Sequence, residues 1–213
     1  MKEKLDYKLL FVGPPLAGKG TQCKLLSKEL GIPHISSGDI LRLEMEKDTD
    51  LAKMIKTKLS HGEFVSDAII MELINNAIKE QKRGFILDGY PRTVEQLNSI
   101  KFDYDAIVFI NTPIEYILDR IEGRLCHPSS GRIYHTRYNP PKAMNLDDLT
   151  GEPLIKRDDD RIELVQRRVL DFIEKTGGVI ERGLELKKLL TIDGGREKEE
   201  VNRDILGALE KLQ

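Results

Sequence analysis

Residues 13–22 have the sequence GPPLAGKGTQ, a glycine-rich loop that carries a lysine and a threonine. Lys19 and Thr21 match a variant of the phosphate-binding loop in which an extra glycine, Gly20, separates the lysine from the hydroxyl residue. Backbone N–H groups of such a loop converge on an anion, the following helix adds its dipole, and the lysine adds a mobile positive charge. The loop therefore predicts a site for nucleotide phosphates.

Leu16 stands in the middle of this loop, where small residues are usual. A leucine at positive φ would cost about 1–2 kcal/mol, whereas at negative φ its N–H could serve a phosphate as well as that of a glycine. We therefore expect negative φ at Leu16. Gly13, Gly18 and Gly20 still allow the backbone to approach a phosphate.

Transfer of a phosphoryl group to an acceptor that is already an anion needs positive charge rather than a general base. The stretch FILDGYPRT places Asp88 at the end of a strand-like run, where a carboxylate that organises magnesium is expected, and Arg92 follows four residues later. Arg157, Arg167 and Arg168 come further along the chain. Any one of these arginines alone would fit a solvated helix face equally well.

The segment PIEYILDRIEGRL shows helical periodicity. Arg120 and Arg124 lie one turn apart on its polar face, so both could reach the same ligand. The apolar face is predicted to contain Ile114, Ile117, Leu118, Ile121 and Leu125.

Five strand-like runs position these residues: YKLLFV, IPHIS, GFILD, DAIVFI and KLLTID. They alternate with helical segments and are mostly apolar, which predicts an α/β fold with a doubly wound, parallel, five-stranded sheet that follows a phosphate-binding loop. The segment from Asp39 to Gln81 has a helical pattern without a strong strand. The segment from Cys126 to Arg157 is rich in Pro, Gly, Ser, Asp and Tyr, with GRIYH its clear strand, and we interpret it as an inserted lid.

These patterns divide one domain of 213 residues into three parts. We assign residues 1–35, 66–125 and 161–213 to the core, residues 36–65 to a helical lobe, and residues 126–160 to the lid.

The charges nearly cancel, with 34 basic and 36 acidic residues, so no overall field would recruit nucleic acid. We find no apolar run of membrane-spanning length and no signal peptide, and we expect a soluble cytoplasmic protein, with an organelle left open. Cys23 and Cys126 have no C-x-x-C spacing, which gives no sign of a disulfide framework and suits a reducing compartment.

The motifs GKGTQ, SSGDILR, LDGYPRT, GRIYH, NPPK and DDLTGEPLIKRDDD follow one another in order. As a set they resemble the adenylate kinases of the nucleoside monophosphate kinase family, from Gly13 to Arg168. The resemblance implies reversible phosphoryl transfer from MgATP to AMP, giving two ADP, by a monomer. The helical lobe would clamp AMP, and the lid would close over ATP and exclude water.

The resemblance also implies roles for individual residues. Magnesium would be organised through its waters by Asp88 and Asp39, and catalysis would rest on Lys19, Arg92, Arg124, Arg157 and Arg168. The ATP site would comprise Leu16, Ala17, Gly18, Lys19, Gly20, Thr21, Arg120, Arg124, Arg196 and the backbone near Ile133 and Tyr134. The AMP site would comprise Ser37, Arg42, Glu63, Phe64, Val65, Gly89, Tyr90, Pro91, Arg92, Gln96, Arg157 and Arg168.

Some relatives hold the lid with zinc on four cysteines. The corresponding positions here are His127, Ser130, Asp147 and Thr150. Because zinc prefers sulfur and nitrogen, this is a poor zinc set, and we expect a hydrogen-bonded replacement without structural zinc.

Several alternatives stay open. GTP could replace ATP as the donor, since SSGD also resembles the GTP-using branch of the family. A UMP or CMP kinase usually has a shorter lid, and a P-loop GTPase would need an N-K-x-D element, which we do not find. A non-catalytic nucleotide-binding regulator would be expected to lose Lys19 or the lid arginines, and this chain keeps them.

Overall fold

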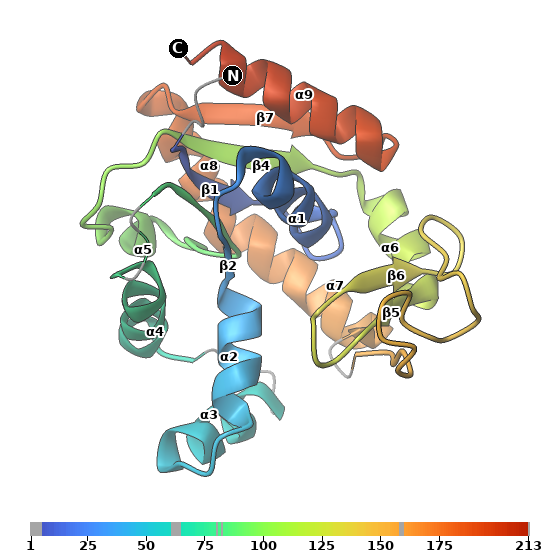
Figure 1. Ribbon diagram of the computed structural model, residues 1–213. Helices are drawn as coiled ribbons and strands as arrows, with labels where there is room; N and C mark the ends of the chain where they lie inside the picture. Colours follow the sequence, from blue (N-terminus) through green and yellow to red (C-terminus); the bar gives the residue numbers. More distant parts are fainter. Residues whose placement is uncertain (1–5, 61–64, 80, 82, 158–159, 213) are drawn as a thin grey trace.

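The computed structural model describes residues 6–60, 65–79, 81, 83–157 and 160–212. Its centre is a five-stranded parallel sheet in the order β2-β3-β1-β4-β7 (Figure 1). The predicted α/β class and strand number are therefore confirmed. The strands are β1 (Lys8–Val12), β2 (His34–Ser36), β3 (Phe85–Asp88), β4 (Ala106–Asn111) and β7 (Leu189–Asp193).

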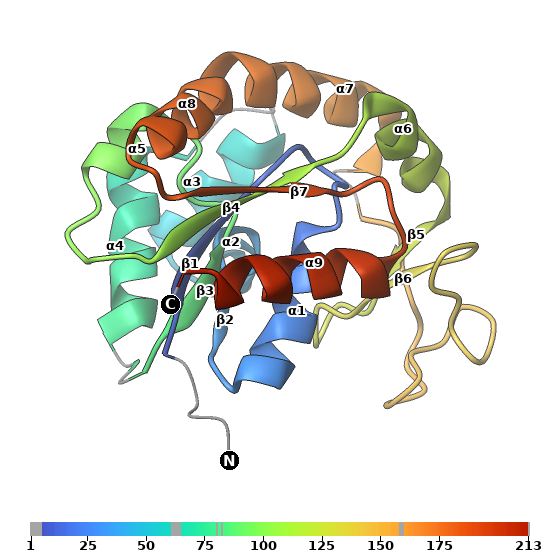
Figure 2. The same ribbon diagram turned by 90° about the horizontal axis from the view of Figure 1, so that it is seen from above.

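Alternate side chains of β1 point to opposite faces of the sheet, and both faces are covered. Leu9 and Phe11 pack with helices α1 and α9, whereas Leu10 and Val12 pack toward α4, α5 and α8. Figure 2 shows the sheet between these two helical layers. Burial on both faces explains why the strands are apolar runs. The covering helices are α1 (Lys19–Leu30), α4 (Asp67–Lys79), α5 (Val94–Asn98), α8 (Gly177–Glu185) and α9 (Lys198–Glu210).

The helical lobe is formed by α2 (Ser37–Met45) and α3 (Asp50–Ser60). Ser36 ends β2 and caps α2, because its hydroxyl accepts a hydrogen bond from the Asp39 backbone N–H at 3.2 Å. The lobe has a small apolar cluster of its own around Leu41, Ile55 and Val65, against which part of α4 packs. The lobe is therefore tied to the core at both of its ends.

The lid contains more strand than the sequence indicates. Strand β6 (Ile133–His135) is the predicted GRIYH strand, but it pairs antiparallel with a second strand, β5 (Arg124–Cys126). Cys126 also forms a bridge with Ile155, so the lid returns along its own first strand. Leu125, Tyr134 and Leu154 form the small core of the lid.

The prediction that Arg124 continues the helix of Arg120 is wrong. Helix α6 (Ile114–Gly123) ends before Arg124, which begins β5. At Gly123 an added Cβ would lie 2.3 Å from a ring carbon of His135, so this position needs glycine for the close approach of β6. Ile117 and Ile121 are buried as expected, but Ile114 is 49% exposed and Leu118 is 44% exposed.

The polypeptide between the lid and β7 forms a long helical segment. It comprises α7 (Ile162–Asp171), one π-helical turn η2 (Phe172–Thr176) and α8. Among the described residues, no helix combines the length and the apolar character that crossing a bilayer would require.

Candidate active site

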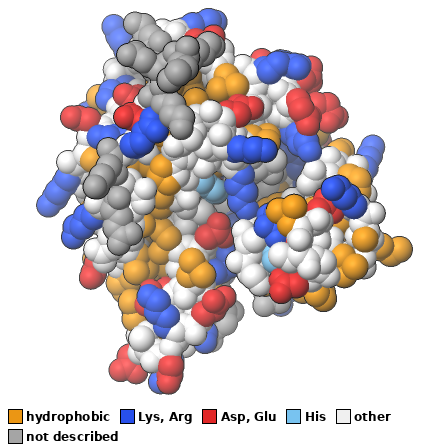
Figure 3. Space-filling view, in the orientation of Figure 1, with side chains coloured by type: hydrophobic (Ala, Val, Ile, Leu, Met, Phe, Trp, Pro, Cys, Tyr) orange, Lys and Arg blue, Asp and Glu red, His pale blue; other side chains and the backbone are white. Residues whose placement is uncertain are grey.

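The carboxyl ends of the parallel strands open into one cavity of about 390 Å³, in the size range of small-molecule sites. Its lining comes from the core, the helical lobe and the lid, and it includes eleven lysine and arginine residues against four acidic ones. Figure 3 shows basic side chains around the hollow between the helical lobe and the lid. The cavity lies at the strand ends where α/β proteins bind ligands, and its charge suits an anion.

Most of the predicted site residues meet in this cavity. Tyr90, Gln96 and Val65 are buried outside its lining, and Glu63 and Phe64 lie outside the described residues. The predicted residues that line the cavity are Leu16, Ala17, Gly18, Lys19, Gly20, Thr21, Ser37, Asp39, Arg42, Asp88, Gly89, Pro91, Arg92, Arg120, Arg124, Ile133, Tyr134, Arg157, Arg168 and Arg196.

The expectation of negative φ at Leu16 is wrong, because its φ is 59°. This left-handed conformation lets the Leu16 side chain pack against an apolar cluster that includes Ile117 of α6 and Val165 of α7. Packing therefore offsets a backbone strain of about 1–2 kcal/mol. Gly13 is needed for a different reason, since a Cβ there would lie 2.7 Å from the carbonyl oxygen of Ile110.

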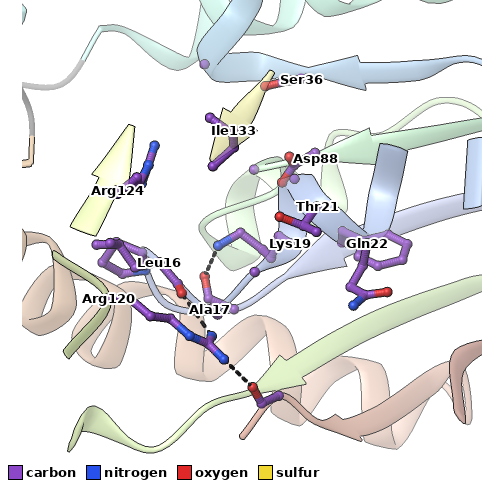
Figure 4. Close-up of a pocket in the computed structure, with 18 of the residues that line it drawn as sticks. Leu16, Ala17, Lys19, Thr21, Gln22, Ser36, Asp88, Arg120, Arg124 and Ile133 are labelled. Carbon is purple, nitrogen blue, oxygen red and sulfur yellow. Dashed lines mark hydrogen bonds between the residues drawn. The ribbon is translucent and has the colours of Figure 1, made fainter. Parts of the chain in front are cut away.

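Arg120 holds the loop from outside. Its guanidinium donates to the carbonyl oxygen of Leu16 at 3.2 Å and to that of Gly194, just after β7, at 3.0 Å (Figure 4). Burial lowers the pKa of Arg120 from its ordinary value. Arg120 thus supports the backbone of the phosphate loop as well as lining the cavity.

Lys19 folds back over its own loop. Its Nζ donates to the carbonyl oxygens of Gly13 and Pro14, each at 2.7 Å. Burial lowers the pKa of Lys19 to about 8, an effect opposed by Asp88 and reinforced by Arg168 and Arg92. A lysine pKa that is lowered by burial and by neighbouring cations is characteristic of a site that binds an anionic ligand.

Two carboxylates stand in the cavity where a magnesium ion could be organised. Asp88 ends β3 beside Lys19 and Thr21, and its Oδ2 lies 3.2 Å from Nε2 of His34. Asp39 accepts a hydrogen bond from Arg42 at 2.5 Å. Burial alone would raise the pKa of Asp39, but Arg42 outweighs it, and the pKa lies below its usual range. Asp39 is therefore ionised at neutral pH.

On the other side of the cavity, the loop after β3 is fixed by hydrogen bonds. Arg92 Nε donates to the Gly89 carbonyl oxygen at 2.8 Å, and the Ser37 hydroxyl donates to the same oxygen at 3.0 Å. The Gln96 amide accepts from the Arg92 backbone N–H at 2.7 Å and donates to Asp67 at 2.6 Å. In this arrangement Gln96 positions the loop of Arg92.

The four lid positions predicted to replace zinc ligands come together. His127 Nδ1 lies 2.7 Å from the Ser130 hydroxyl, and the Thr150 hydroxyl donates to Asp147 at 3.0 Å. Arg132 donates two further hydrogen bonds to Asp147, at 2.6 Å and 2.5 Å. These bonds, Arg132 first, hold the pKa of Asp147 well below its usual range. We call His127, Ser130, Arg132, Asp147 and Thr150 the lid network.

Sequence reasoning missed several residues of the cavity lining, among them Lys24 and His34. Lys24 donates a hydrogen bond to the Gly131 carbonyl oxygen and so connects α1 with the lid. Its position three residues after Thr21, on the same helical face, is a signal that could have found it. His34 pairs with Ile86 in the register between β2 and β3, which makes it a diagonal neighbour of Asp88. That register is not visible in the sequence.

Comparison with known proteins assigns the chain to a family. The family model "Adenylate kinase" matches residues 11–184. Adenylate kinases of the Coxiella burnetii strains Dugway 5J108-111 and RSA 331 / Henzerling II are each 43% identical to it over 177 residues, covering 81% of this chain and 77% of the relative. The chain belongs to the adenylate kinase family. The family match ends before β7 and α9, so a role for Arg196 in an adenylate kinase site rests here on its position in the cavity.

Proposed function

We propose that this adenylate kinase family member reversibly transfers the terminal phosphoryl group of MgATP to AMP, giving two ADP. One observation carries the proposal: a phosphate-binding loop opens into a single cavity that is also lined by arginines from the core, the helical lobe and the lid. Two facing polyphosphates would repel each other, and convergent guanidinium groups counter that repulsion.

On the donor side, the backbone N–H groups of the phosphate loop and the first turn of α1 would cradle the β- and γ-phosphates of ATP. Lys19 would leave its two loop carbonyls and follow the transferred group as a point charge. Arg120, Arg124 and Arg196 would surround the phosphates from α6, β5 and the segment after β7, and the lid backbone near Ile133 and Tyr134 would lie against the nucleoside.

On the acceptor side, Ser37, Arg42 and Arg92 would hold the AMP phosphate, with the backbone of residues 89–91 beside it. Arg157 and Arg168 would contact the phosphates of both nucleotides. A phosphate oxygen of AMP would attack the γ-phosphorus of ATP, and the bond from this phosphorus to the β-phosphate oxygen would break. No general base is needed, because the attacking phosphate oxygen is already ionised. Gln96 lies outside the lining and would act here through the position of Arg92.

The donor set fits magnesium. Asp39 and Asp88 both line the cavity and offer carboxylate oxygens, the ligands that magnesium prefers, often through water. When bound, the ion neutralises charge on the phosphates of ATP. We propose a monomer as the active form, as the resemblance to adenylate kinases implies.

The function is tested by coupled assays that pair ATP or GTP with AMP, UMP or CMP. We expect the highest turnover with ATP and AMP. The same assays with a Lys19→Met variant control for contaminating kinases. Faster turnover with GTP than with ATP would identify GTP as the preferred donor. No turnover with any pair would favour the non-catalytic regulator.

A further inference from the structure

Three side chains of different chemistry meet beneath the phosphate loop. Cys23 comes from α1, His34 from β2 and Asp88 from the end of β3. One donor atom from each, the Cys23 Sγ, a His34 ring nitrogen and an Asp88 carboxylate oxygen, lies within 4.8 Å of the other two. The phosphate-transfer reaction proposed above uses neither Cys23 nor His34.

The spacing of these atoms is close to that around one metal ion. Ligand atoms around a tetrahedral zinc lie roughly 3.3–3.8 Å apart, given metal–ligand bonds of about 2.0–2.3 Å. The His34 Nε2 and Asp88 Oδ2 atoms are already 3.2 Å apart. Movement of these side chains by about 1 Å would therefore bring all three donors within bonding distance of one ion.

The surroundings also suit a bound ion. Cys23 is fully buried, while His34 and Asp88 line the cavity, so an ion can enter through the cavity and keep a fourth position open toward it. In the described part of the chain, no second group of three such donors lies this close together. The lid network therefore does not form such a group. The sulfur and nitrogen donors favour a borderline or soft divalent ion over magnesium, which prefers oxygen.

We propose that Cys23, His34 and Asp88 form a site for a zinc-class divalent cation at the base of the phosphate site. Binding replaces the proton on the Cys23 sulfur by the metal, so one proton is released for each ion bound. Burial raises the pKa of Cys23, so the metal must compete with that proton. Lys19, which lies near Asp88 and has a pKa of about 8, adds a positive charge that opposes metal binding below about pH 8.

The functional consequence rests on the proposed kinase activity. An ion at this site occupies Asp88, the carboxylate expected to organise magnesium, and places extra positive charge beside Lys19. Zinc is therefore expected to inhibit phosphoryl transfer while magnesium and ATP are in excess. The binding itself can be measured without nucleotide, so its failure and that of the kinase function are distinguishable.

The test is a titration of the nucleotide-free protein with Co²⁺, which reports a thiolate ligand by a charge-transfer band in the near ultraviolet. We expect the band in the natural protein and in Cys126→Ser, the matched control for the other thiol of the chain. We expect Cys23→Ser to lose it and to bind Co²⁺ roughly 100-fold more weakly or worse. Circular dichroism checks that the variant is folded.

A missing band in the natural protein at saturating Co²⁺, or a band that persists in Cys23→Ser, would overturn the proposal. If Cys23→Ser does not fold, His34→Gln keeps the test open. That variant should retain the thiol but weaken Co²⁺ binding by about tenfold or more. Unchanged affinity in His34→Gln would equally overturn the site.

Discussion

The phosphate loop and the lid network differ in how the charges of their side chains are compensated. In the lid, the Asp147 carboxylate is fully buried and receives hydrogen bonds from Arg132, Tyr134 and Thr150, so its charge is matched locally. In the loop, Lys19 donates to carbonyl oxygens of its own loop and has a pKa of about 8, with Arg92 and Arg168 nearby. A buried charge that is paired by other groups of the protein, as that of Asp147 is, is expected to stabilise the folded structure.

The difference separates a structural cluster from a functional one. Satisfied buried polar networks fix a fold, whereas crowded cations in a cleft cost stability until a ligand supplies the opposite charge. Changes in the lid network should therefore alter lid stability first, and changes around Lys19 should alter turnover first.

The largest expected effect comes from Lys19→Met. We propose that Lys19 stabilises the transferring phosphoryl group, so loss of this cation should lower turnover about 1,000-fold. Because protonated Lys19 is desolvated, its removal should not lower the melting temperature. Lys211→Met, an exposed change at the end of α9, is the matched control and should keep full turnover. Near-normal turnover in Lys19→Met would show that Lys19 does not stabilise the transferring phosphoryl group.

A smaller effect is expected from Asp147→Asn, which breaks the lid network with little change in shape. The backbone N–H groups of Cys126 and Ile155 each donate to the carbonyl oxygen of the other residue, and they should exchange hydrogen roughly tenfold faster or more. Asp148→Asn, at the neighbouring residue, should leave exchange nearly unchanged. If both variants behaved alike, the lid network would not be what stabilises the lid.

The pKa of Lys19 predicts how nucleotide affinity depends on pH. Bound phosphates favour protonated Lys19 and raise its pKa, so above pH 8 the protein must take up a proton to bind. The contribution of Lys19 to ATP affinity should therefore be constant below about pH 7 and fall about fivefold between pH 8 and pH 9. Calorimetry on the natural protein and on Lys19→Met measures this, and the variant should lack the fall.

Two changes at Leu16 separate backbone strain from packing. Leu16→Ala keeps the strain at φ 59° and loses the contact with α6 and α7, so it should reduce the free energy of unfolding by about 1–2 kcal/mol. Leu16→Gly also loses the contact but relieves the strain, and its net change should stay below about 1 kcal/mol. Denaturant unfolding measures both. Greater stability of Leu16→Ala than of Leu16→Gly would refute this account of the loop.

The smallest effect should follow from metal chelation. The lid network offers one imidazole, two hydroxyls and a carboxylate in place of thiolates, which is a poor set for zinc. Adding a strong chelator should therefore leave hydrogen exchange of the lid amides unchanged. Faster exchange would mean that a metal holds the lid together.

Much of this arrangement was predictable because it depends on local patterns. The apolar runs marked the five strands, and the loop that contains Lys19 and the arginines after it marked the cavity. What failed depends on contacts between distant segments. The positive φ of Leu16 follows from packing against α7, and the break before Arg124 follows from the approach of His135 to Gly123. The proximity of Cys23 and Asp88 follows from the order of the strands in the sheet, which a single sequence does not reveal.

The most direct test of the central claim is a crystal structure with AMP and an inert ATP analogue bound together. The quantity to measure is the distance from Lys19 and from the guanidinium nitrogens of Arg92, Arg124, Arg157 and Arg168 to the phosphate oxygens. We predict distances of about 2.7–3.2 Å, with Lys19 released from the carbonyls of Gly13 and Pro14. Phosphates bound elsewhere, or arginines that stay turned away from them, would contradict the account.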